Sequence, residues 1–191
     1  MVQHETSDDL AGKLLIAMPS MADTRFERSV IYLCEHNAHS SMGLIVNKPM
    51  ADIGFSALLE QLSIPVGPAL REIGVHFGGP VDHARGFVLH SAEYHGDEGT
   101  MRLRGGFSMT ATTDILADLA HGGGPDRALM ALGYAGWGPG QLMAEIRQNG
   151  WLTCAADPDV VFGRDDDGKW SAALALMGVD PLTLSGAAGH A

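Results

Sequence analysis

Two apolar segments joined by a short polar turn constrain the fold of this chain more than any other feature. Residues 29–36 are almost continuously apolar and rich in β-branched and aromatic types, which predicts a strand buried on both faces. Residues 42–47 form a second strand-like segment, which Pro49 ends because proline cannot donate to a central ladder. The turn over residues 37–41 is short enough that the two strands are predicted to pair as an antiparallel hairpin.

The rest of the chain predicts further strands in pairs, with helices between the pairs. A glycine-rich turn at residues 78–80 and a short loop are expected to join the strands at 73–77 and 86–90. Strict alternation of strand and helix is missing, which favours an α+β fold with a mixed, mainly antiparallel sheet. The predicted strands cover residues 14–18, 73–77, 86–90, 100–104, 107–109, 127–134 and 151–155, and the predicted helices cover 55–62, 113–121, 138–148 and 170–177.

The length of 191 residues fits one domain, and neither a linker nor an internal repeat divides the chain. Apolar residues make up 46% of the sequence and charged residues 18%, a balance typical of a globular protein. We therefore expect a single domain over residues 12–178. Residues 1–11 are predicted to be a flexible N-terminal tail, and residues 179–191 a C-terminal tail of small residues.

The formal net charge is −11, and no cluster of three or more Lys or Arg residues occurs. Such a chain repels phosphate backbones, so direct nucleic-acid binding is disfavoured. No run of about 18 apolar residues predicts a membrane helix. The polar, acidic start lacks the features of a secretory signal, so we expect a cytoplasmic protein with reduced Cys34 and Cys154.

The glycine-rich segment at residues 133–142 is the most unusual stretch of the sequence. It leads from a predicted strand into a helix start, where free N–H groups can bind an anion. Its glycine spacing matches neither a dinucleotide fingerprint nor a phosphate-binding P-loop. The alternative interpretation is a tight turn with close packing around Trp137. The residues of the hypothetical anion site are Lys48, as counter-charge, with Gly136, Gly138, Gly140 and Gln141.

Three other groups of residues contain side chains that could carry chemistry. Cys34, His36 and His39 could hold zinc, but their spacing matches no zinc pattern and lacks a fourth ligand, which favours a buried cysteine beside two surface histidines. The His90-Ser91 pair lacks a nucleophile elbow, so His90 is expected to form local hydrogen bonds at a strand end. Residues 165–169 resemble part of a calcium loop without its required donors, which predicts a solvated turn before the last helix. No metal or cofactor is predicted.

Several long segments, taken together, resemble the YqgE/AlgH family. The likeness runs from about Gly12 to the region of Gly178. It is carried by residues 12–23, 29–36, 43–49, 78–81, 86–90 and 132–142, with Trp151-Leu152. The resemblance implies a bacterial, cytoplasmic, single-domain protein with a curled, barrel-like mixed sheet flanked by helices. The family is labelled as transcriptional regulators and brings no settled catalytic residues.

Three hypotheses about function follow. The absence of a catalytic motif and the family label favour a non-enzymatic regulatory or interaction module that acts through a protein partner. The second hypothesis is binding of, or action on, a small anionic ligand at the Gly133–Gln141 segment. Direct DNA binding is the weakest, and the sequence does not specify an oligomeric state. The polar residues within the matching segments that we select as a candidate functional surface are Asp23, His36, Asn47 and His90.

Overall fold

The computed structural model describes residues 10–96 and 98–184 and confirms the hairpin that the sequence predicts. Strands β2 (Val30–His36) and β3 (Ser41–Ile45) pair antiparallel, with Tyr32 opposite Leu44 and an irregularity between Leu33 and Glu35. The hairpin lies at the centre of the sheet, where it is flanked by strands on both sides.

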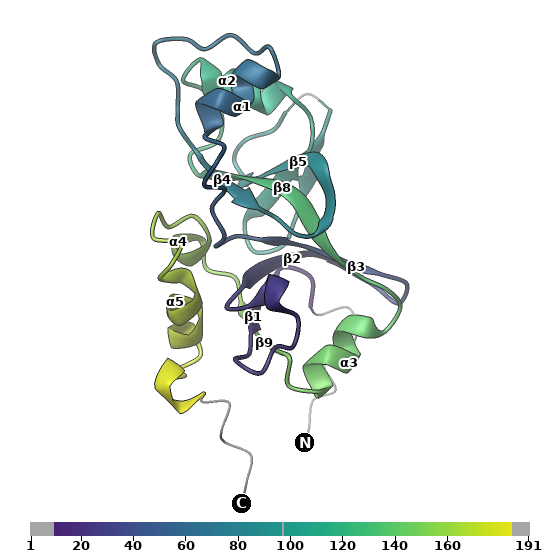
Figure 1. The fold of residues 1–191 in the computed structure, drawn as a ribbon. Helices are drawn as coiled ribbons and strands as arrows, with labels where there is room; N and C mark the ends of the chain where they lie inside the picture. The colour runs from purple at the N-terminus through teal and green to yellow at the C-terminus, as the bar shows by residue number, and fades with distance from the viewer. Residues whose placement is uncertain (1–9, 97, 185–191) are drawn as a thin grey trace, which may run out of the picture.

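A curled, half-barrel sheet forms the centre of this single α+β domain (Figure 1). The strands follow one another in the order β6-β7-β5-β8-β3-β2-β1-β9, and β4 pairs with β8 outside this path. Every pairing is antiparallel except that of β4 with β8. The remaining strands are β1 (Lys13–Ala17), β4 (Gly74–Phe77), β5 (Val81–Ser91), β6 (Thr100–Arg102), β7 (Phe107–Thr110), β8 (Ala128–Trp137) and β9 (Trp151–Ala155).

The long strand β8 connects two parts of the molecule. Its first half pairs with β4 and β5, and its second half pairs with β3. Figure 1 shows this strand running from the part that carries α1 (Phe55–Gln61) and α2 (Asp114–Ala120) toward the part that carries β1 and β9. The two parts therefore share one continuous backbone ladder.

Strands β1 and β2 are buried on both faces of the sheet, which explains their continuous apolar sequences. Leu14 and Ile16 enter one core cluster, whereas Leu15 and Ala17 enter a second on the opposite face. A third cluster lies between the sheet and helices α1 and α2. Helices α4 (Pro158–Val161) and α5 (Lys169–Leu176) cover the first cluster, and α3 (Gln141–Arg147) covers the second.

The structure corrects the expected pairing of residues 73–77 with 86–90. Strands β4 and β5 do not pair with each other, because each lies along β8 instead. The chain crosses β8 at Gly78 and Gly79, where the Gly78 amide donates to the Leu132 carbonyl at 2.8 Å. A Cβ atom at Gly79 would lie 2.0 Å from the carbonyl carbon of Tyr134, so only glycine fits this crossing.

The glycine-rich segment also differs from the expectation. Residues 133–137 continue β8 rather than forming a loop, and Gly136 lies opposite Met42 of β3. Helix α3 begins at Gln141 instead of residue 138, because Gly140 adopts a left-handed conformation with φ of +69°.

The described parts of the two expected tails contact the domain. Leu10 is buried in the second core cluster, and Val179 and Leu184 pack against the first. A short 3-10 helix, η3, covers Pro181–Thr183. Residues 1–9 and 185–191 of these tails lie outside the described residues. Within residues 10–96 and 98–184, no helix has the length and apolar character needed to cross a membrane.

We expect Gly79→Ala to lower the free energy of unfolding by about 2–4 kcal/mol, because the new methyl group meets backbone that cannot move aside. For a chain of this size the melting temperature should fall by roughly 5–15 °C. Gly138→Ala is the matched control, since its Cβ would have only the Gln141 Oε1 atom nearby, at 3.9 Å. Thermal denaturation that gave equal stabilities for the two variants would contradict the proposed close approach.

Candidate functional site

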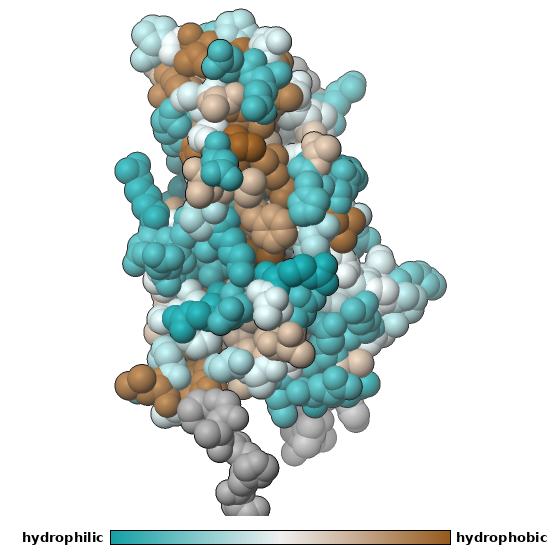
Figure 2. Space-filling model, viewed as in Figure 1, coloured by the Kyte–Doolittle hydropathy of each residue, from teal (hydrophilic) through white to brown (hydrophobic). Residues whose placement is uncertain are grey.

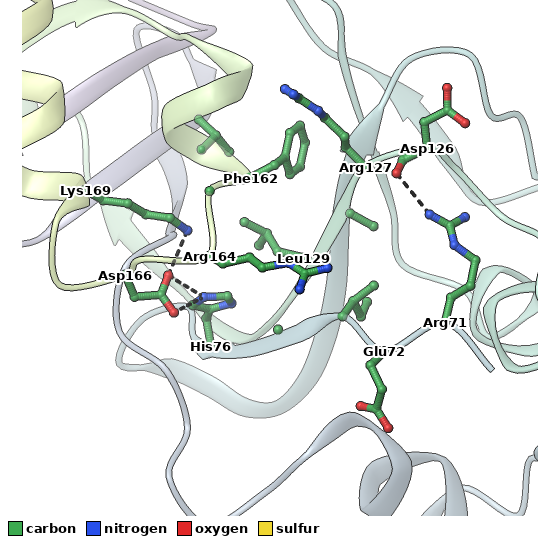
Figure 3. A pocket seen from close by; sticks show the side chains of 15 residues that line it. Arg71, Glu72, His76, Asp126, Arg127, Leu129, Phe162, Arg164, Asp166 and Lys169 are labelled. Atoms are coloured by element: carbon green, nitrogen blue, oxygen red, sulfur yellow. Dashed lines mark hydrogen bonds and ion pairs between the residues drawn. The ribbon is translucent and has the colours of Figure 1, made fainter.

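Three ionisable side chains meet at the floor of a cleft (Figure 3). His76 lies on β4, Asp166 precedes α5, and Lys169 is the first residue of that helix. The His76 Nε2 atom is 3.0 and 3.1 Å from the two carboxylate oxygens of Asp166. The Lys169 amine lies 2.8 Å from Asp166 Oδ1 and donates to the Val46 carbonyl, also at 2.8 Å. The cluster therefore ties helix α5 to two segments of the sheet.

Burial sets the electrostatics of this floor, because His76 and Lys169 are each only 3% exposed. Burial by itself would raise the pKa of Asp166, but the hydrogen bonds and charges of His76 and Lys169 outweigh it and lower the pKa. Burial lowers the pKa of Lys169, while its contact with Asp166 acts in the opposite direction. Each buried charge thus depends on its partner for stabilisation.

Both nitrogens of the His76 ring face acceptors. Nδ1 lies 3.3 Å from the Met130 carbonyl oxygen, and Nε2 faces Asp166. The ring can donate to both only when it carries two protons. Gly74 makes room for it, since a Cβ atom there would lie 2.7 Å from the His76 Cε1 atom.

Arginines surround the mouth of the cleft, which encloses about 430 Å³. Arg71 donates to the carbonyl oxygens of Gly123, Pro125 and Asp126, and Arg127 pairs with Asp159 at 2.7 Å. These two arginines, with Arg164 and the His76–Asp166–Lys169 floor, define what we call the arginine cleft. Its apolar wall consists of Ala128, Leu129, Val161 and Phe162.

Arg164 differs from the other two arginines. It makes no hydrogen bond or ion pair with any residue that the structure describes, and Figure 3 shows its guanidinium group extending across the cleft beside Leu129. The carboxylates of Glu72 and Asp126 point away from the cleft in the same view. The cleft thus presents an unpaired cation next to an apolar wall.

The structure does not gather the hypothetical anion site of the glycine-rich segment into one pocket. The Gly138 amide donates to Gln141 Oε1 at 3.1 Å, and Gln141 Nε2 donates to Glu145 Oε1 at 3.1 Å. The other oxygen of Glu145 accepts the indole N–H groups of Trp137 and Trp151, each at 2.9 Å. The carboxylate of Glu145 thus already lies beside the first turn of α3, close to where an anion would bind. Gly136 and Gln141 border one depression, whereas Lys48 lines a different one.

The residues of the candidate functional surface lie apart and have local roles. Asp23 caps a 3-10 helix, η2 (Thr24–Phe26), and pairs with Arg25 at 2.6 Å. The His36 Nδ1 atom lies 2.7 Å from Ser41 Oγ. The Asn47 side chain forms hydrogen bonds with the backbone of Arg28 and Val30.

His90 is fully buried and lies between the Ser91 carbonyl and the Thr110 hydroxyl, at 2.9 and 2.8 Å. Burial is the largest influence on this ring and lowers its pKa. These contacts agree with the predicted local hydrogen bonding at a strand end.

The cysteine and histidines of residues 34–39 do not form a metal site. Cys34 is buried, burial raises the pKa of its thiol, and its sulfur lies 4.0 Å from that of Met109. His36 is half-buried and His39 is exposed. Among residues 10–96 and 98–184, no three His, Cys, Asp or Glu side chains are grouped so as to hold a metal ion.

Sequence reasoning missed the floor of the arginine cleft. Residues 165–169 were expected to form a solvated turn, which is wrong for Asp166 and for the almost completely buried Lys169. The helical period carried a usable signal, because Lys169 lies four residues before Ala173 and so on the buried face of α5. His76 had no such signal, since its partner is 90 residues away in the chain.

A protein-family model described as AlgH-like matches residues 14–182. The chain belongs to the AlgH-like family. UPF0301 proteins of this family from Ruegeria pomeroyi and Cereibacter sphaeroides are 62% and 59% identical to it over 184 and 183 residues. Each of these alignments covers 96% of the chain and the whole of the relative. The names of these relatives carry no activity.

Solved structures of AlgH-like fold agree with the architecture. The solution structure of the AlgH protein from Pseudomonas aeruginosa matches with a TM-score of 0.75 at 43% identity, covering 94% of this chain and 95% of that one. A crystal structure of a protein from Corynebacterium diphtheriae matches with a TM-score of 0.69 at 22% identity, over 91% and 90% of the two chains. The second likeness supports the fold alone.

We expect Asp166→Asn to destabilise the protein by about 2–4 kcal/mol at neutral pH, because it removes the negative charge that faces the buried Lys169 ammonium and accepts from His76. The folded-state pKa of Asp166 is lowered, so its contribution is present above the unfolded pKa and is lost as the pH falls through the folded pKa. The difference between wild type and variant should therefore shrink in acid.

The measurement is urea unfolding at a series of pH values, with the exposed neighbour Asp167→Asn as control. The control should change stability little at any pH. A wild-type advantage over Asp166→Asn that stays constant down to the lowest pH would contradict the assigned role of the carboxylate.

Proposed function

We propose that this chain is a non-enzymatic binding module whose arginine cleft captures an organic anion, a carboxylate attached to an apolar body. The observation that carries the proposal is the guanidinium group of Arg164. On a chain of net charge −11, it extends unpaired across a cleft whose other arginines already have partners. A planar guanidinium group binds carboxylates through two parallel hydrogen bonds.

The floor of the cleft supports the same choice of ligand. Two of the three N–H groups of the Lys169 ammonium have partners, Val46 and Asp166, which leaves one donor for a ligand oxygen. A carboxylate oxygen of a ligand above the floor would accept from this donor.

The apolar wall of the cleft favours a ligand whose carboxylate is attached to a hydrophobic group. Leu129 and Phe162 border the cleft close to Arg164, so a hydrophobic group attached to the carboxylate could pack against them (Figure 3). The cleft offers no serine or cysteine nucleophile among its described lining residues. This composition favours binding over covalent catalysis.

Benzoate, an aromatic carboxylate, should shift the amide NMR signals of residues 162–166 and 127–129. Arg164→Ala should weaken this binding about tenfold or more, and Arg164→Lys should give an intermediate loss because it keeps the charge without the planar fork. Arg102→Ala, at an exposed position on β6, is the control and should bind as wild type does. Unshifted signals in the wild type, or equal affinity in Arg164→Ala, would refute the proposal.

A protein partner is the second candidate, and any regulatory role would then pass through it rather than through DNA. Three large apolar side chains are exposed near the end of α5: Leu176 at 45%, Met177 at 38% and Leu182 at 87%. Figure 2 shows hydrophobic surface gathered at this end of the molecule. The net charge of −11 opposes contact with a phosphate backbone.

A photo-crosslinking residue at position 182 should capture a defined protein in cells, and one at the exposed Leu62 should not. The captured protein, once purified, should bind wild type and lose at least about tenfold in affinity with Met177→Glu, which places a charge in the apolar patch. Identical crosslinks at both positions, or unchanged affinity for the variant, would exclude this surface.

A further inference from the structure

A second cleft of about 330 Å³ lies on the other side of Asp166, which lines both clefts. Charged and amide side chains make up most of its lining, together with Pro49 and Trp170. The residues that line it are Glu27, Arg28, Asn47, Lys48, Pro49, Asp166, Asp167 and Trp170. The proposed carboxylate function does not use these residues, except for Asp166.

The backbone of Arg28 adopts an unfavourable conformation at the edge of this cleft. Its φ angle is +52°, in the left-handed region that residues with a Cβ atom seldom occupy. The Asn47 side chain holds it there, accepting from the Val30 amide at 2.9 Å and donating to the Arg28 carbonyl at 2.8 Å. Strain that persists because neighbouring groups enforce it is a feature of ligand-binding sites.

The guanidinium group of Arg28 is also held in place. Its Cζ atom lies 4.3 Å from the centre of the Trp170 ring. That ring is itself fixed, because it is 3% exposed and its N–H donates to the Ala17 carbonyl at 2.8 Å. A guanidinium cation over an aromatic ring is attracted by the ring face and needs none of its N–H groups for that contact, so they remain free for other partners. None of them has a hydrogen-bond partner in the described part of the chain.

Lys48 places a second cation in the same cleft. Burial lowers the pKa of its amine, and the nearby charge of Glu27 opposes that shift only in part. The amine has no hydrogen-bond partner within residues 10–96 and 98–184. An anion in contact with this amine would stabilise its charged form.

We propose that this second cleft binds a phosphoryl group, held by the Arg28 guanidinium and the Lys48 ammonium. A preorganised planar fork together with a compact point charge suits a doubly charged oxyanion better than a single carboxylate. Asp166 does not compete for these cations because its oxygens accept from His76 and Lys169. Glu27 and Asp167 do face the cleft, and their like charge limits the affinity.

The experiment is a titration of the full chain with inorganic phosphate, followed by NMR at constant ionic strength with chloride as the reference anion. The indole N–H signal of Trp170 should move, because the ring contacts Arg28. The indole signals of Trp137 and Trp151 provide an internal control. Both rings belong to a different core cluster from Trp170, and both donate to Glu145. These two signals should stay in place, and they report that each variant is folded.

Three variants separate binding from structure. Arg28→Gly removes the side chain and suits the left-handed backbone, so it should fold with equal or higher stability and bind phosphate about tenfold or more weakly. Lys48→Gln should also weaken binding. Asp167→Asn removes a facing negative charge and should tighten it a few-fold.

A movement of the Trp170 signal that saturates with phosphate, and that Arg28→Gly abolishes, supports the site. An unmoved Trp170 signal, or a phosphate response that survives in Arg28→Gly, overturns it. Benzoate distinguishes the two clefts. Arg28→Gly should still bind benzoate in the arginine cleft, whether or not phosphate binds in the second cleft.

Discussion

The contact between residues 78–79 and strand β8 is the constraint on which the other features depend. Because Gly78 and Gly79 lack side chains, the chain crosses β8 at backbone contact distance and can place β4 and β5 on the same strand. That arrangement leaves the start of β8 bordered by β4, and His76 on β4 then contacts Asp166, in the segment that precedes helix α5. A side chain at Gly79 would push β4 away from β8, and His76 would then lose its position at the floor of the arginine cleft.

Within the described residues, the cationic side chains of this acidic protein fall into two groups, those with hydrogen-bond or ion-pair partners and those without. Arg71 and Arg127 are held by carbonyl groups and by Asp159, and they act as parts of the framework. Arg164, Arg28 and Lys48 lack such partners among the residues that the structure describes, and all three border clefts. Since the overall charge is negative, cations that border two depressions without a hydrogen-bond partner are better explained by ligands than by stability.

Local patterns predicted most elements of the fold, and long-range pairing was the part that they could not supply. The hairpin of residues 29–47 follows from its short turn, and helix α5 follows from the spacing of Trp170, Ala173 and Leu174. The pairing of β4 with β8 joins residues over 50 positions apart and has no local signal.

The candidate site was less predictable for the same reason. Asp166 lies in a run of acidic residues that is typical of a solvated turn, and only its distant partner His76 distinguishes it from its neighbours. Asn47 and Lys48 were selected from the sequence, and the structure places them beside Arg28 rather than beside the glycine-rich segment. Polar residues were thus easier to select than to assign to a common site.

Glu145 holds Trp137 and Trp151 with a single carboxylate oxygen. Trp137 ends β8 and Trp151 begins β9, and three strands, β3, β2 and β1, separate these two in the sheet order. One side chain of α3 therefore joins two strands that do not pair with each other, and the two indole rings also pack edge to face, with centroids 6.1 Å apart. These contacts restrain the separation of β8 and β9, so side chains on one face support the curvature of the sheet in addition to strand twist.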